Sequence, residues 1–112
     1  DFDNSPLNKD DINLIGSTTL SMSEKHHLRM LLHCLECFKL MSNGNKKGLI
    51  PRKEVWLEWC LKNPVMFEDD EFVQVLLEQF SGAATQLERL SNALKVSPLE
   101  LTVRDLIDVY EA

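Results

Sequence analysis

The residues best placed to do chemistry stand in one short segment, NGNKKGLIPRKE, at positions 43–54. A loop that wraps a calcium ion needs oxygen ligands at its first, third and fifth positions, a turn-making glycine at the sixth, a carbonyl at the seventh and a glutamate at the twelfth. The segment meets most of these needs, and Gly48 stands at the turn. The candidate calcium ligands are Asn43, Asn45, Leu49 and Glu54.

The charge of this loop argues against tight calcium binding. Lys47 stands at the fifth position, where an oxygen ligand is needed, and Asn43 is neutral. Glu54 is then the only carboxylate facing a doubly charged ion, and calcium affinity depends on the number of charged ligands. We therefore expect no cofactor, with calcium as the alternative.

The loop and its flanking segments, ECFKLM and VWLEWCL, resemble the EF-hand superfamily. A second segment, LTVRDLIDVY at 101–110, aligns with IPRKEVWLEW at 50–59. The resemblance implies a pair of helix-loop-helix units joined by a two-residue β bridge between Leu49–Ile50 and Leu101. It also implies an apolar groove that holds an amphipathic helix of a target protein. The candidate groove residues are Met30, Met41, Trp56, Trp59, Phe72 and Phe80.

A basic cluster surrounds the same loop and consists of Lys46, Lys47, Arg52 and Lys53. Cations beside the two tryptophans could contact phosphates and stack on bases, which makes a nucleic-acid-binding domain the alternative function. The same cations could bind an acidic protein segment. The net charge of −6 and the sequence pI near 5.0 favour the protein partner.

Histidines and cysteines offer a weaker hypothesis. His33 and Cys37 lie four residues apart, so a helix would place them on one face, and Cys60 could join them around a zinc ion. Structural zinc sites usually add a second compact ligand pair, which this sequence lacks. The sequence also has no nucleophile elbow, phosphate-binding glycine loop or His-Glu metal motif. We therefore expect a protein that is not an enzyme.

Apolar spacing and capping residues predict an all-α fold of four to five helices. Ser21 and Glu24 have the spacing of a capping box, so a first helix is predicted from there to about Met41. A second helix is expected after Pro51, and a last one after Thr102. Between them, residues 69–95 are predicted to form either one helix or two, because Thr85 is a possible second cap.

Composition places these helices in one domain. The first 20 residues are predicted to form a flexible arm, and residues 21–112 a single helical domain with units at 21–63 and 68–112. Three cysteines without an export signal indicate reduced thiols in an intracellular protein, cytoplasmic or nuclear. No apolar run is long enough to cross a bilayer.

These observations favour a non-catalytic, regulatory module that binds another protein. The predicted partner segment is an amphipathic helix or an acidic stretch, and the sequence does not identify the protein that carries it.

Overall fold

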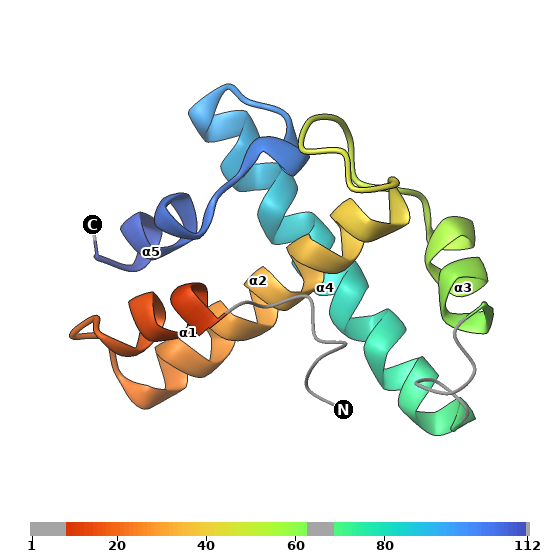
Figure 1. Ribbon diagram of the computed structural model, residues 1–112, viewed down its shortest axis with the longest axis horizontal. Coiled ribbons are helices and arrows are strands. Elements are labelled where there is room, and N and C mark those ends of the chain that lie inside the picture. The colour runs from red at the N-terminus through yellow and green to blue at the C-terminus, as the bar shows by residue number, and fades with distance from the viewer. Residues whose placement is uncertain (1–8, 63–68, 112) are drawn as a thin grey trace.

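The computed structural model describes residues 9–62 and 69–111, and every regular element within them is a helix. The predicted all-α class is therefore confirmed. The elements in chain order are α1 (Lys9–Gly16), α2 (Met22–Met41), α3 (Lys53–Leu61), α4 (Asp70–Leu94), the short 3-10 helix η2 (Pro98–Glu100) and α5 (Val103–Glu111) (Figure 1).

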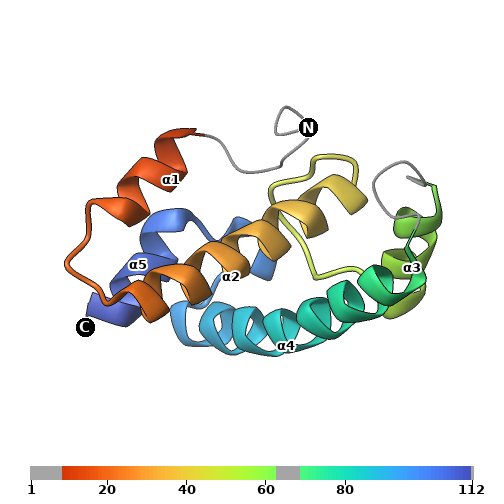
Figure 2. The same ribbon diagram turned by 90° about the horizontal axis from the view of Figure 1, so that it is seen from below.

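Two long helices, α2 and α4, cross at the centre of the molecule (Figures 1 and 2). The other elements attach to this pair: α1 and α5 contact α2, whereas α3 and η2 contact both long helices. The loop after α2 lies beside the connection between α4 and α5 (Figure 1). These attachments determine which sides of α4 are covered and which stay open to solvent.

Local capping explains where the helices begin and end. The Ser21 hydroxyl accepts from the backbone N–H of Glu24 at 3.1 Å, and the Glu24 carboxylate accepts from Ser21 N–H at 3.0 Å, as the sequence predicted. Asn43 and Gly44 both adopt positive φ, which ends α2. Thr102 and Asp105 form a similar reciprocal pair before α5.

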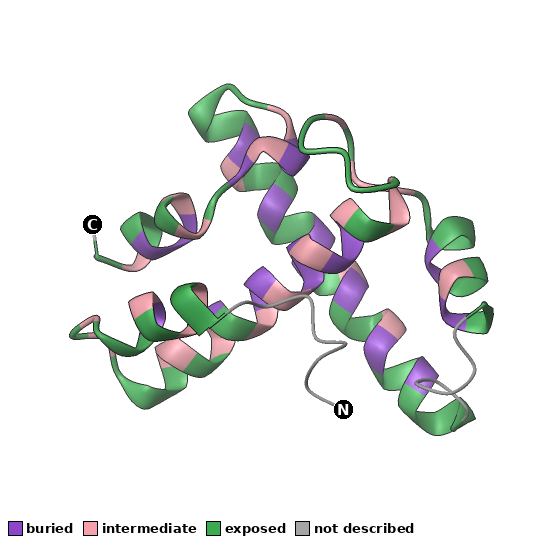
Figure 3. Ribbon diagram, viewed as in Figure 1, coloured by how far each residue is buried: buried purple, intermediate pink, exposed green. Residues whose placement is uncertain are grey.

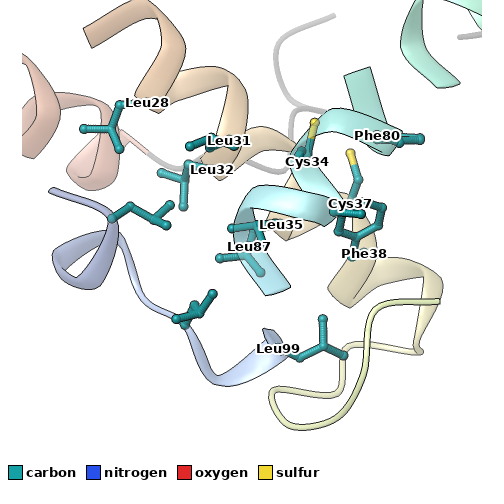
Figure 4. Close-up of a cluster of buried hydrophobic side chains, with 14 of the residues drawn as sticks. Leu28, Leu31, Leu32, Cys34, Leu35, Cys37, Phe38, Phe80, Leu87 and Leu99 are labelled. Atoms are coloured by element: carbon teal, nitrogen blue, oxygen red, sulfur yellow. The ribbon is translucent and has the colours of Figure 1, made fainter. Parts of the chain in front are cut away.

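The core lies between α2 and α4, where the buried faces of both helices meet (Figure 3). At its centre three aromatic rings contact one another: Phe38 and Phe80 have centroids 5.3 Å apart, and Trp56 lies 5.5 Å from Phe38 and 5.8 Å from Phe80. Leucines of α2 and Leu87 of α4 continue the core away from this cluster (Figure 4). Trp56 is the main anchor of α3, because Trp56 and Cys60 are the only buried residues of that helix.

Residues 70–94 form one continuous helix, which resolves the choice between one helix and two. Thr85 does not cap a new helix, since its hydroxyl donates to the Ser81 carbonyl within α4 at 3.3 Å. Ala83 and Ala84 are buried where a break was considered, so the apolar face continues through that region. Packing against α2 therefore outweighs the local break signal at Gly82.

Two other parts of the chain differ from the prediction. In place of a flexible arm over residues 1–20, residues 9–16 form α1, whose Ile15 is completely buried against α2. The predicted β bridge is absent from the described residues. Instead the N–H of Leu99 donates to the Gly48 carbonyl at 3.1 Å, while Leu101 is buried in the core. Residues 1–8 and the predicted boundary at 63–68 lie outside the described residues.

The aromatic cluster provides a test of the core. Replacing Phe80 by alanine removes a fully buried ring, and we expect the free energy of unfolding to fall by about 3–5 kcal/mol. The matched change at Phe72, which is 49% exposed, should cost about 1 kcal/mol or less. Chemical denaturation followed by far-ultraviolet circular dichroism measures both values. Equal losses at the two positions would contradict this description of the core.

Candidate functional site

The loop with the predicted calcium ligands connects the end of α2 to η2 through hydrogen bonds. The N–H of Gly48 donates to the Ser97 hydroxyl at 2.9 Å, and the Gly48 carbonyl accepts from Leu99 N–H at 3.1 Å. Gly48 has φ of +131°, so a side chain there would be strained. Asn45 and Glu54 are exposed, and Leu49 is 80% exposed. The glycine therefore serves a turn that holds the loop against η2.

Ser97, which binds this loop, is held in place by the carboxylate of Glu100. Glu100 accepts hydrogen bonds from the backbone N–H of Ser97 at 2.8 Å and from its hydroxyl at 2.7 Å. These bonds, together with the nearby Lys47 cation, lower the pKa of Glu100. Lys47 is therefore part of an internal electrostatic contact as well as an exposed cation. Among the described residues, no group of histidine, cysteine, aspartate or glutamate side chains is arranged to hold a metal ion.

The predicted groove residues do not gather on one surface. Phe80 is completely buried and Trp56 is 4% exposed, because both belong to the aromatic cluster of the core. Phe80 is therefore unable to contact a partner, and its assignment to a groove was wrong. Met30, Met41 and Trp59 are half-buried against the core. Amphipathic spacing alone could not separate these core positions from surface ones.

A real groove lies between α3 and α4, and we call it the α3–α4 groove. It consists of two adjoining hollows of about 440 and 290 Å³ that share Lys53, Trp56 and Ser81. Its length follows from helix geometry, since Gln74 and Glu88 at its two ends are separated by about 21 Å along α4. The full lining is Ile50, Pro51, Arg52, Lys53, Glu54, Trp56, Leu57, Gln74, Leu77, Glu78, Ser81, Ala84, Thr85 and Glu88.

The two walls of the α3–α4 groove differ in charge. On the α3 side the exposed cations are Arg52 and Lys53, with Glu54 beside them. The α4 wall carries Glu78 and Glu88 and no cation. Of the predicted basic cluster, only Arg52 and Lys53 line the groove, whereas Lys46 and Lys47 lie in the preceding loop. The groove is therefore of mixed charge, and it contains only two of the four residues of the predicted basic cluster.

Trp56 holds the two walls of this groove in place. Its indole N–H donates to the Pro51 carbonyl at 2.7 Å, which ties the segment before α3 to the helix. Its ring is packed on Phe80 of α4, and its exposed edge lines both hollows. Trp56 thus shapes the groove while most of its surface is core, and its predicted contact with a partner stays a prediction.

A second groove lies between α4 and α5, and we call it the α4–α5 groove. It has a volume of about 410 Å³ and includes Leu31 of α2 in its lining. This groove was not predicted from the sequence. The spacing of apolar residues in α4 or α5 does not indicate a groove, because the space depends on where α5 is attached in the folded chain.

The three cysteines are buried and unpaired. Burial raises the pKa of the Cys34 thiol to about 12 and raises the pKa values of the Cys37 and Cys60 thiols as well. The Cys37 sulfur lies 3.7 Å from Nε2 of His33. Burial also lowers the pKa of His33, so this contact does not supply a cation that would favour a thiolate. These thiols behave as apolar core groups.

This chemistry can be measured directly. At pH 8 we expect all three thiols of the native chain to react with iodoacetamide at least about two orders of magnitude more slowly than in the denatured chain, because a raised pKa lowers the thiolate fraction. Mass spectrometry of timed samples counts the labelled cysteines. Immediate labelling of a thiol in the native chain would contradict the burial described here.

Comparison with known proteins identifies one family. The model of a family described as NDH complex assembly factor CRR9 matches residues 7–112. No curated protein and no solved structure matches the chain. The resemblance to the EF-hand superfamily was therefore wrong, since the matching family spans nearly the whole chain and is a different one. The residue spacing that resembled a calcium-binding loop belongs to the turn at Gly48, which is hydrogen-bonded to Ser97 and to Leu99 of η2.

Proposed function

Because the chain belongs to the family of the NDH complex assembly factor CRR9, we propose that it helps to assemble an NDH complex by holding a helix of a partner protein in the α3–α4 groove. The family match over residues 7–112 is the observation that carries this function. The groove supports the proposed binding of a partner, because assembly factors must bind other polypeptides and this groove is open to them.

The shape and polarity of the α3–α4 groove favour a helical occupant. Its length of about 21 Å corresponds to about 14 helical residues. Leu57 and Leu77 provide apolar contact on opposite walls, and Leu57 is 43% exposed. A helix docked in such a groove buries an apolar stripe of residues spaced three and four apart.

Charge restricts the occupant further. The flank of the docked helix that faces α4 would contact Glu78 and Glu88, so this flank should carry lysine or arginine. The opposite flank meets Arg52 and Lys53 and should carry carboxylates. The sequence predicted an amphipathic helix or an acidic segment, and this pattern favours an amphipathic helix with charges of both signs. It also favours a protein over a nucleic acid, because the two carboxylates of the α4 wall would repel phosphates.

The proposed role is non-catalytic. The thiols are buried core groups, and the contact between His33 and Cys37 does not activate the thiol, since burial raises the pKa of Cys37 and lowers the pKa of His33. In residues 9–62 and 69–111, no helix combines the length and apolar character of a bilayer-spanning segment. Function without calcium and an intracellular location both remain predictions.

The proposal is tested by placing a charge on the apolar wall of the groove. We expect Leu57→Glu to weaken partner binding by about tenfold or more, because docking would then bury a carboxylate in an apolar contact. Cells whose own copy is replaced by this variant should therefore accumulate less NDH complex, which native gel electrophoresis measures. The melting temperature should stay close to that of the unchanged chain, since Leu57 is exposed.

The matched control is Val75→Glu, on the outer side of α4. Val75 is 52% exposed and lines neither groove, so this variant should support normal accumulation of the complex. Normal accumulation with Leu57→Glu, or an equal deficit with both variants, would overturn the location proposed for partner binding. A chain that is dispensable for the NDH complex would overturn the function itself.

A further inference from the structure

The α4–α5 groove is nearly all apolar, unlike the α3–α4 groove. Gln86, Arg89 and the hydroxyl of Tyr110 are the polar groups among the described residues that line it. Val109 on its rim is 52% exposed, so apolar surface remains open to solvent at this place. The apolar and aromatic lining consists of Leu31, Leu87, Leu90, Ala93, Leu106, Val109 and Tyr110.

The attachment of α5 keeps this groove open. After α4, η2 contacts both long helices, and α5 then packs on α2. Reciprocal hydrogen bonds between Thr102 and Asp105 fix the start of α5, and Leu106 and Ile107 bury its inner face. The side of α5 that carries Val109 therefore faces α4 across a space, and the small side chain of Ala93 does not fill it.

The polar residues of the lining point to the chemistry of an occupant. Gln86 already has a partner, because its Oε1 lies 2.9 Å from Nε2 of His27. Arg89 is the only charged residue in the lining, and it forms no ion pair with another described residue. An apolar segment that brought a carboxylate to Arg89 would gain a charge-assisted hydrogen bond at the rim.

From these observations we propose that the α4–α5 groove is a second docking site, which takes a short amphipathic helix of a partner protein with a carboxylate placed on Arg89. The α4 wall from Gln86 to Ala93 spans about 10.5 Å, or two helical turns. The volume of about 410 Å³ suits the apolar side chains that two such turns present at spacings of three, four and seven residues.

This site goes beyond the function proposed above and does not depend on it. The two grooves share no lining residue, because they lie on different flanks of α4. One chain can therefore hold two segments at the same time. Such a chain would hold two polypeptides together, a role that one groove alone could not provide.

Site-specific photo-crosslinking tests the proposal in cells that contain the full chain. A benzoylphenylalanine at position 109 stands on the rim of the groove, and the same residue at position 75 is the control, because Val109 and Val75 are both 52% exposed. We expect an adduct from position 109 alone. Mass spectrometry should place it on a protein segment with helical apolar spacing and a carboxylate on its flank.

Charge reversal then tests the role of Arg89. Arg89→Glu should lower the yield of the adduct by about tenfold, as expected for loss of a charge-assisted contact, and changing the partner's carboxylate to lysine should restore it. Thermal unfolding of Arg89→Glu should match that of the unchanged chain, since Arg89 is exposed.

The other outcomes overturn the proposal. They are no adduct from position 109, equal adducts from both positions, an adduct with a lipid, a nucleic acid or a second copy of this chain, or a yield unaffected by Arg89→Glu. None of these results bears on Leu57 and the α3–α4 groove, so failure here is distinguishable from failure of the proposed function.

Discussion

The contact between Phe38 of α2 and Phe80 of α4 is the interaction on which the rest of the structure depends. It fixes the crossing of the two long helices, and Trp56 joins it to hold α3 in place. One face of α4 is buried in this core, and the two flanks of the helix are left to form the grooves. One flank forms the α3–α4 groove and the other the α4–α5 groove. A rigid core thus positions both candidate surfaces.

Features set by neighbouring residues could be predicted from the sequence. The capping pairs at Ser21 and Thr102 fix helix starts through local hydrogen bonds, and the positive φ of Asn43 ends α2. The same local rules suggested a break near Thr85, where burial of Ala83 and Ala84 keeps α4 continuous. Helix α1 was not predicted, because Ile15 is its one buried residue. A single buried residue does not make an apolar repeat that could be recognised in the sequence.

The candidate site was only partly predictable for a related reason. Glycine and an apolar residue at fixed spacing occur in many loops that must turn and return to a core. In this chain Gly48 binds Ser97 and Leu99, residues that lie about half the chain away in sequence. The α4–α5 groove likewise depends on contacts between distant segments. Trp56 and Lys53 were named from the sequence for their chemistry and their place after the loop, and both line the α3–α4 groove. Their contact with a partner stays a prediction.

The central claim is that partners bind along both flanks of α4 while the core stays unchanged. Hydrogen exchange, compared between the free chain and the chain within an NDH assembly intermediate, tests it most directly. Because α3 and α5 are short and bury few residues, docking should suppress their local opening and slow exchange in residues 53–61 and 103–111. Exchange in α1 should stay the same. Slowing confined to α1, or no change in α3 and α5, would contradict the account.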